Sequence, residues 1–317
     1  MSDFVFQGME YVYAVYRAGS FRQAAENLLV SQPSISASVR RAEERIGTPI
    51  FDRSFKPLRL TQCGERYIDA VEKIMTLEQE FTEYVNDWGG LLRGTLTVGG
   101  SSLFSSMILP PILSRFRDSF PDISLELVEN TTGELEAMLQ SGTIDMVVDY
   151  EIPHSESYDY AILEDEILLL AVPKDMDVNA NLKSYRVDHK KIQNAEALTD
   201  SVPPVPLERF REQPFILLKS GNDSRRRADD LCSRYGFMPK PLLEFDQQMT
   251  SYRVSCSGLG VCFVSSTLVR LLGPSKDMVY YRPSGSSARR QICLFWKKDR
   301  YFTRAMDEFK RFALYED

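Results

Sequence analysis

The chain has 317 residues, a hydrophobic share of 43% and a formal net charge of -7, an ordinary composition for a protein with two or three folded domains. No apolar run approaches the roughly 18 residues of a membrane-spanning helix. The N-terminus lacks the order of a secretory signal, so we expect a cytoplasmic protein without a membrane partner. Five cysteines without a CxxC pair and only two histidines exclude the common metal-ligand spacings, and we expect no metal and no cofactor.

Positive charge is concentrated at one end of the chain. Residues 1–60 carry eight Lys and Arg against six Asp and Glu, whereas the remainder carries 30 against 39. A basic segment on an acidic chain is typical of a module that faces phosphate groups. This asymmetry is a first indication of a nucleic-acid partner.

The first sixty residues predict short helices. Apolar residues recur at helical spacing up to Gly19, which ends the first helix. Ser20, with a glutamine three residues later, predicts a capping box for a second helix. Ser31 caps a third helix, which has Pro33 in its first turn and ends at Gly47. Two short helices joined by a tight turn favour a helix-turn-helix, although a three-helix scaffold without a DNA role remains an alternative.

The next segment predicts a wing and a long helix. PIFDRSFKPLRLT, residues 49–61, has two short apolar stretches around a basic loop, as in a β-hairpin, and Arg53, Lys56 and Arg59 are candidates for phosphate contacts. Thr61 caps a helix that runs to about residue 88. Its apolar residues recur at steps of four and three, which is a heptad seam. We expect a second copy of the chain to cover this seam at Ile74, Leu77, Phe81 and Tyr84. Packing on the C-terminal part of the same chain is the alternative.

After a predicted hinge at Gly89–Gly90 and Gly94, strands and helices alternate. Expected strands at 95–100, 122–130 and 144–150 form a βαβαβ run, which implies a parallel sheet. A second α/β half has expected strands at 166–173, 214–218, 241–246 and 261–266. We expect the chain from VYYRP, residues 279–283, onward to return to the first half. The polar, proline-containing stretch between Asp175 and Pro206 predicts a surface excursion or mobile loop.

Residues 14–53, AVYRAGSFRQAAENLLVSQPSISASVRRAEERIGTPIFDR, closely resemble the N-terminal signature of LysR-type transcriptional regulators. GTLTVGG, LPPILSRFRDSFPDISLEL, LQSGTIDMVV and SCSGLGVCFV resemble the effector-binding half of that family. The resemblance covers nearly the whole chain and implies an α/β fold class. Its expected parts are a winged helix-turn-helix (1–60), a linker and dimerisation helix (61–90) and an effector-binding domain like type 2 periplasmic binding proteins (91–317). The latter would divide into subdomain I (about 91–162 and 271–317) and subdomain II (about 163–270).

The resemblance implies a regulator rather than an enzyme. Such a protein binds double-stranded promoter DNA as a homodimer or homotetramer, acts with RNA polymerase, and binds a small effector that changes promoter binding or bending. A thiol-based redox sensor of the same family and a solute-binding protein are the alternatives. No P-loop, GxSxG or dinucleotide fingerprint favours an enzyme.

The match also implies which residues face DNA. These are Ser20, Gln32, Pro33, Ser34, Ser36, Ala37, Arg40, Arg41 and Arg53. The arginines would contact phosphates, and Gln32, Ser34 and Ser36 would contact bases. Ala37 and Ser38 stand where family members often carry larger base-reading side chains. We therefore expect fewer direct base contacts and more readout of DNA shape.

A ligand site is expected beyond the carboxyl ends of the strands. A strand ends at Gly99–Gly100 and a helix begins at Ser101–Ser102, whose backbone N–H groups and hydroxyls suit an anion, although simple helix capping is the alternative. With the resemblance, the expected effector-binding residues are Ser101, Ser102, Thr131, Asp149, Lys219, Ser220 and Gln248. We expect an anionic effector, which Asp149 would repel unless Lys219 or a bound cation offsets its charge.

Overall fold

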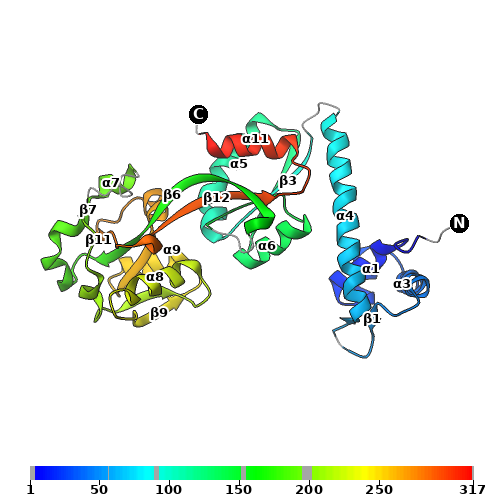
Figure 1. The fold of residues 1–317 in the computed structure, drawn as a ribbon, viewed down its shortest axis with the longest axis horizontal. Coiled ribbons are helices and arrows are strands. Elements are labelled where there is room, and N and C mark those ends of the chain that lie inside the picture. Colours follow the sequence, from blue (N-terminus) through cyan, green and yellow to red (C-terminus); the bar gives the residue numbers. More distant parts are fainter. Residues whose placement is uncertain (1–3, 56, 89–92, 151–154, 195–201, 316–317) are drawn as a thin grey trace. The chain divides into compact units, whose positions relative to one another are not determined.

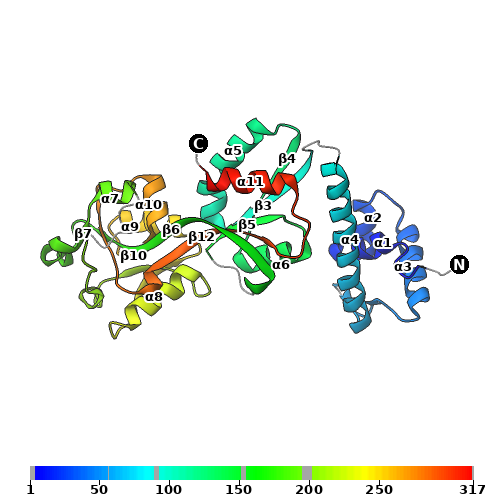
Figure 2. The same ribbon diagram turned by 45° about the horizontal axis from the view of Figure 1, so that its top comes forward.

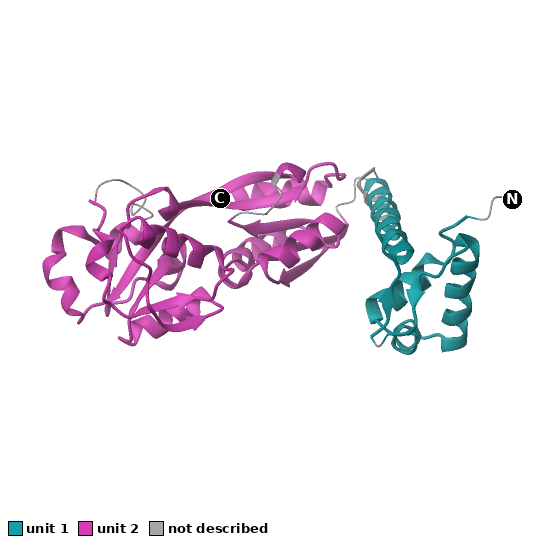
Figure 3. Cartoon of the chain, turned by 60° about the horizontal axis from the view of Figure 1, so that its bottom comes forward, with its two compact units in different colours: residues 1–85 teal, residues 86–317 magenta. Residues whose placement is uncertain are grey.

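The computed structural model describes residues 4–55, 57–88, 93–150, 155–194 and 202–315. The chain divides into two compact units, Met1–Val85 and Asn86–Asp317 (Figure 3). The predicted wing residue Lys56 and the predicted hinge at Gly89–Gly90 lie outside the described residues. None of the helices in the described part of the chain is long and apolar enough to cross a membrane.

The first unit is the expected winged helix-turn-helix followed by a long helix (Figure 1). Its elements are α1 (Met9–Ala18), α2 (Phe21–Asn27), α3 (Gln32–Ile46), β1 (Phe51–Asp52), β2 (Arg59–Leu60) and α4 (Gln62–Trp88). The wing is the antiparallel pair of β1 and β2. Tyr67, Ile68 and Val71 of α4 are buried in the same core as the apolar faces of α1 to α3, so the start of α4 completes this core.

Local hydrogen bonds set the helix boundaries. Ser20 accepts from the backbone N–H of Gln23, and Ser31 accepts from the N–H three residues later. The predicted capping box at Ser20 is only half formed, because the Gln23 side chain donates to Asn27 at 3.1 Å instead of returning to the cap. Gly47, in the left-handed conformation at φ 79°, ends α3.

The turn between α2 and α3 contains a strained residue. Among the described non-glycine residues, only Leu29 has a positive φ, of 55°, and its side chain is 94% exposed. The left-handed conformation costs an L-residue about 1–2 kcal/mol, and an exposed side chain gains little packing in return.

Leu29→Asn is therefore expected to raise the free energy of unfolding of the first unit by about 0.5–1 kcal/mol, since Asn tolerates this conformation. Hydrogen exchange of the α3 amides would measure the change. Leu28→Asn is the matched control, because Leu28 is also exposed but has a φ of -89°. Equal effects of the two substitutions would show that backbone strain at Leu29 is not the cause.

The second unit is an α/β unit of two subdomains (Figure 2). Its strands are β3 (Gly94–Gly100), β4 (Ile123–Glu129), β5 (Met146–Asp149), β6 (Tyr158–Pro173), β7 (Arg186–Val187), β8 (Phe215–Leu218), β9 (Pro241–Phe245), β10 (Val261–Ser265), β11 (Met278–Tyr281) and β12 (Arg289–Lys297). Its helices are α5 (Leu109–Ser119), preceded by a π-helical turn (Phe104–Ile108), α6 (Thr132–Ser141), α7 (His189–Gln193), α8 (Asp223–Ser233), α9 (Gln248–Cys256), α10 (Ser266–Leu272) and α11 (Arg304–Leu314).

The strand order positions the ends of the parallel strands. Within the described residues, the sheet runs β4-β3-β5-β12-β6-β10-β8-β9. In subdomain I, β3 lies parallel to β4 and β5; in subdomain II, β8 lies parallel to β9 and β10. The antiparallel strands β6 and β12 run between the two subdomains (Figure 2). The carboxyl ends of β4, β3 and β5 therefore lie next to one another at the same end of the sheet.

Strand β11 lies in subdomain II. It pairs with residues 170–173 of β6, and Tyr280 and Tyr281 are fully buried in the core of that subdomain. The predicted boundary at residue 271, and the expected return of VYYRP to the first half, are wrong for this strand. Its apolar sequence indicates a buried strand but does not specify which β6 segment it pairs with.

The expected surface excursion between Asp175 and Pro206 is also wrong for its described residues. These form 3₁₀ turns, β7 and α7, and β7 pairs with β11. Leu182, Val187 and Ile192 are at most 3% exposed. The Asn179 side chain donates to two backbone carbonyls at 2.8 and 3.0 Å. Widely spaced apolar residues in a polar segment give no periodic signal, although each one is buried.

Candidate functional site

The surface of α3 divides as the helical period requires. Ile35, Val39 and Ala42 are fully buried. The residues expected to face DNA are exposed on α3 at Gln32, Pro33, Ser34, Ala37, Arg40 and Arg41, partly exposed at Ser20 and Ser36, and exposed on the wing at Arg53. The start of α3 thus presents small polar side chains, with arginines one or two turns later.

Ser38 does not belong to this surface. It is 6% exposed, and its hydroxyl accepts from Arg41 at 3.0 Å. The expectation that Ser38 occupies a base-reading position is wrong, because the helical period turns it toward the core beside Val39. Ala37 stays exposed and offers only a methyl group for contact.

Glu43 connects α3 to the wing and was not found from the sequence. One carboxylate oxygen accepts from the backbone N–H groups of Ile50 and Phe51, at 3.0 and 3.3 Å. The other lies 3.0 Å from the Arg53 guanidinium, which also stands over the Phe21 ring at 5.2 Å. The sequence signal for this role was that Glu43 is an acidic residue among arginines. Glu43 therefore sets the position of the wing cation.

The second half of α4 exposes an apolar row. Leu77, Phe81 and Tyr84 are 67%, 66% and 43% exposed, and Ile74 is partly exposed. A contiguous row of large exposed apolar side chains marks an interaction surface more often than a solvated face.

A cleft of about 800 Å³ opens at the carboxyl ends of β3, β4, β5 and β8. Its lining includes all seven residues expected to bind an effector: Ser101, Ser102, Thr131, Asp149, Lys219, Ser220 and Gln248. It also includes residues that the sequence did not indicate, among them Glu129, Thr132, Tyr150, Asp223, Ser224 and Asp246. Glu129, Tyr150 and Asp246 lie at the ends of predicted strands, and this position was the one signal that pointed to them.

Two glycines bring the strand end against the helices that flank the cleft. A Cβ added at Gly100 would lie 2.9 Å from Cβ of Phe104, and one at Gly99 would lie 2.8 Å from Leu135. Side chains there would push these elements apart. The close packing places Ser101 and Ser102 at the start of a helix, where the first backbone N–H groups have no intrahelical acceptor.

Asp149 is a buried carboxylate in the cleft wall, 3% exposed. It accepts from the Tyr150 backbone N–H at 2.7 Å and from the Thr132 hydroxyl at 2.9 Å. No Lys or Arg nitrogen of the described residues lies within ion-pair distance, and burial raises the pKa of Asp149 to about 6. Lys219 instead pairs with Asp246 at 2.7 Å, so the expected offset of the Asp149 charge by Lys219 is not present.

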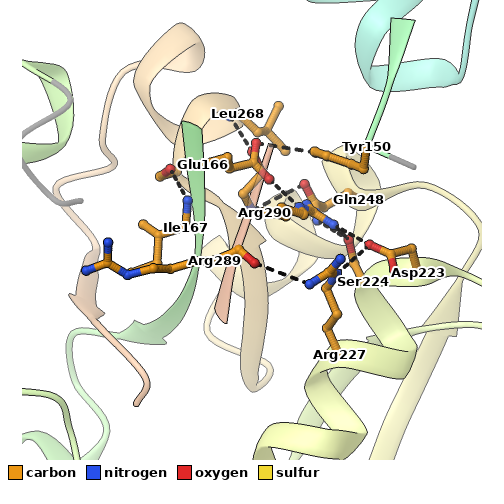
Figure 4. Close-up of polar contacts among 12 residues, drawn as sticks. Tyr150, Glu166, Ile167, Asp223, Ser224, Arg227, Gln248, Leu268, Arg289 and Arg290 are labelled. Atoms are coloured by element: carbon orange, nitrogen blue, oxygen red, sulfur yellow. Dashed lines mark hydrogen bonds and ion pairs between the residues drawn. The ribbon is translucent and has the colours of Figure 1, made fainter. Parts of the chain in front are cut away.

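Behind the cleft wall, Arg290 of β12 makes a buried ion-pair cluster (Figure 4). Its Nε lies 2.6 Å from Glu166, and its Nη1 lies 3.0 Å from Asp223 and 2.8 Å from the Ser224 hydroxyl. The guanidinium carbon lies 3.3 Å from the ring centre of Tyr150. The side chains of Arg290 and Glu166 are 1% and 0% exposed. The cluster joins both crossover strands to the start of α8.

The cysteines do not favour the redox alternative. All five are free thiols, and Cys232, Cys262 and Cys293 are buried. Burial raises the pKa of Cys232 and Cys262 to about 12 and that of Cys293 to about 11. A redox sensor needs an accessible thiolate, which these environments oppose.

Two protein-family models and several curated proteins are similar in sequence to this chain. The model of the LysR substrate binding domain matches residues 89–316, and the model of the lysR-family bacterial regulatory helix-turn-helix protein matches residues 6–65. An uncharacterized HTH-type transcriptional regulator, YcgK of Bacillus subtilis (strain 168), is 29% identical over 95% of this chain and 91% of its own length. A probable RuBisCO transcriptional regulator of Emiliania huxleyi is 32% identical over 98% of this chain and 95% of its own length.

Solved structures share the fold. A full-length OxyR variant from Pseudomonas aeruginosa has a TM-score of 0.70, 21% identity and coverage of 99% of this chain and 95% of its own. Full-length CbnR in complex with its target DNA has a TM-score of 0.61, 19% identity and coverage of 97% and 98%. At these identities the structures show the fold alone. The two family matches and the curated relatives show more: the chain belongs to the LysR family and is a DNA-binding transcriptional regulator, not an enzyme.

Proposed function

We propose that this regulator binds promoter DNA as a homo-oligomer and that a small molecule in the cleft changes how it binds or bends that DNA. The observation that carries the proposal is the polar cleft at the strand ends, in the same chain as an exposed α3 surface. The protein would act in the cytoplasm, with promoter DNA and RNA polymerase as partners. That CbnR was solved with its target DNA supports the DNA-binding part.

In this proposal the start of α3 enters the major groove. Gln32, Ser34 and Ser36 contact base edges, while Pro33 and Ala37 make apolar contacts with bases. Phosphate contacts come from a wider set, namely Ser20, Arg40, Arg41 and Arg53. Since few side chains here donate hydrogen bonds to bases, DNA shape contributes more of the specificity.

A gel-shift experiment with the DNA upstream of the protein's own gene tests this function. We expect a shift that a scrambled DNA of equal length does not give, and a change in affinity or mobility when a cleft ligand is added. Equal affinity for both DNAs would contradict specific regulation.

Arg53→Ala is expected to weaken binding to every DNA sequence by about three- to tenfold and to lower the salt slope by about one, because one phosphate contact is lost. Fluorescence anisotropy at several salt concentrations measures both quantities. Arg117→Ala on α5 removes the same charge from an exposed site of the second unit and should leave both unchanged. An unaltered salt slope in Arg53→Ala would exclude the phosphate contact.

We propose that a second copy of the chain covers the apolar row of α4, formed by Ile74, Leu77, Phe81 and Tyr84. The row follows the heptad spacing of a two-helix seam, and its side chains are exposed in the single chain. Each dimer then presents two α3 helices to DNA, and the protein acts as a dimer or as a tetramer of two dimers.

The double variant Leu77→Glu with Phe81→Glu is expected to dissociate the oligomer, because four carboxylates would face each other across each seam. Sedimentation velocity measures the assembled mass. Thr82→Glu adds negative charge to an exposed position of the same helix and should leave the mass unchanged. A double variant that sediments like the wild type would place the interface elsewhere.

In the cleft, the helix start at Ser101–Ser102 is proposed to bind a carboxylate of the effector. Thr131 and Asp149 would contact the ligand from subdomain I, and Lys219, Ser220 and Gln248 would contact it from subdomain II. Residues from both subdomains are needed because a ligand held from both sides can change their separation.

A further inference from the structure

Three neighbouring strand ends place an anion-binding helix start between two carboxylates. In the sheet, β3 lies between β4 and β5, and Gly100 pairs with Glu129 on one side and with Val148 on the other. Ser101 therefore follows β3 between Glu129, at the end of β4, and Asp149, at the end of β5. All three residues line the cleft.

The positive charges near the cleft are held by other carboxylates. Lys219, the one Lys or Arg among the lining residues that the structure describes, lies 2.7 Å from Asp246. Arg290, behind the wall, is shared by Glu166 and Asp223 at 2.6 and 3.0 Å. The cations that the structure brings closest to the site are thus already in ion pairs.

Glu129 and Asp149 remain without a cation. No Lys or Arg nitrogen in the described parts of the chain makes an ion pair with either of them, although Asp149 is only 3% exposed. The charge of Arg290 acts on Asp149 only from beyond ion-pair distance. The two hydrogen-bond donors to Asp149, Thr132 and the Tyr150 backbone, are uncharged. Asp149 is thus a buried carboxylate in a ligand cleft and has no Lys or Arg as an ion-pair partner. Such a carboxylate is suited to pair with a cationic group of the ligand.

A purely anionic effector does not fit this wall. A carboxylate at Ser101–Ser102 would share the cleft wall with Asp149. Lys219 is already paired with Asp246, and Arg290 is 1% exposed and does not line the cleft, so neither stands between the two charges. An adjacent ammonium group on the same ligand removes the repulsion and pairs with Asp149. A simple diamine satisfies Asp149 but leaves the helix start without an anion.

We propose that the cleft binds a zwitterion in which an ammonium group stands next to a carboxylate, as in a free α-amino acid, with the carboxylate on Ser101–Ser102 and the ammonium on Asp149. This inference rests on the proposed effector function of the cleft. It replaces the expectation of an anionic effector with a ligand that carries no net charge at its head.

The test is a thermal-shift screen of the full-length protein with free α-amino acids, each paired with the 2-oxo acid of the same carbon skeleton. The two members of a pair share the carbon skeleton and the carboxylate, but the oxo acid carries an uncharged carbonyl oxygen at C2 in place of the ammonium group. At least one amino acid is expected to raise the midpoint, with an affinity at least tenfold higher than that of its oxo acid. Asp149→Asn should lower the affinity for that amino acid at least tenfold, whereas Asp118→Asn, an exposed charge removal on α5, should leave it unchanged.

The outcomes separate this inference from the proposed function. If an oxo acid protects as well as its amino acid, or if Asp149→Asn keeps full affinity, the ammonium contact is wrong. If Ser102→Ala reduces protection by that oxo acid, the effector function of the cleft still stands. If no compound of either class protects the wild-type chain, the zwitterion proposal falls, whereas the effector function is still tested by the gel shift with other small molecules. The comparison of paired ligands uses only the wild-type protein, so it does not depend on the folding of a variant.

Discussion

Arg290→Ala is expected to lower the free energy of unfolding of the second unit by about 3–5 kcal/mol, because it leaves the buried carboxylate of Glu166 without its cation. The Glu166 side chain is 0% exposed, and its other contacts are the hydroxyls of Ser265 and Tyr150. Hydroxyls stabilise a carboxylate less than a guanidinium does. Urea unfolding, followed by near-ultraviolet circular dichroism, measures the loss.

A second substitution distinguishes the buried charge from lost packing. Glu166→Gln in the Arg290→Ala background should restore part of the stability, because the neutral amide no longer needs a cation. Lys240→Ala is the matched surface control, since this ion pair with Glu212 is 75% and 74% exposed and should give no measurable change. A second substitution that destabilises the chain further would indicate that packing around Arg290, and not the charge of Glu166, dominates.

Asp149→Asn is expected to raise the free energy of unfolding of the second unit by about 2–3 kcal/mol at pH 7. Burial raises the pKa of Asp149 to about 6 from the ordinary 3.8. Arg290 lowers this pKa and Asp223 raises it, but both effects are smaller than that of burial. Asn keeps the shape, accepts from the Tyr150 N–H and donates to the Thr132 hydroxyl, so the substitution removes the charge with little other change.

The pH dependence of this gain has a definite sign. Between pH 3.8 and about 6 the folded chain binds more protons at Asp149 than the unfolded chain. The stability that the protonated carboxyl contributes is therefore full below pH 3.8 and is lost as the pH rises through about 6. Urea midpoints between pH 4 and pH 8 should show the variant gaining on the wild type as the pH increases. Parallel curves for the two proteins would contradict the raised pKa.

Arg290 and Asp149 differ in how their buried charges are balanced. Glu166 and Arg290 form a buried ion pair, whereas Asp149 is buried in the cleft wall without an ion-pair partner and its pKa is raised to about 6. A residue that costs stability and lines a cleft is a candidate for function, since natural sites often keep such groups at the expense of stability.

Local signals were sufficient to predict the first unit. The serine caps at Ser20 and Ser31, the glycine end at Gly47 and the apolar period of α3 depend on residues within one or two turns of each other. The strand ends that form the cleft were predicted in the same way, and all seven expected effector residues line it. Their contacts with a ligand remain a proposal.

The errors have a common physical cause. Ser38 was placed at a base-reading position by the family resemblance, yet the helical period buries it. The pairing of β11 with β6 depends on residues more than a hundred positions apart, and no local pattern encodes that partner. The core residues of the 175–206 segment, such as Val187, are too sparse for a periodic signal.

From residue order alone, the α/β class, the helix-turn-helix and the strands that line the cleft could be inferred, because caps, periods and turns act between near neighbours. The charge state of the cleft could not be inferred, because it depends on which ion pairs form. Glu166 meets Arg290 across 124 positions, and Lys219 meets Asp246 across 27. These long-range pairings leave Asp149 without a cation, and so the three-dimensional arrangement, more than the motif, indicates what kind of ligand the cleft suits.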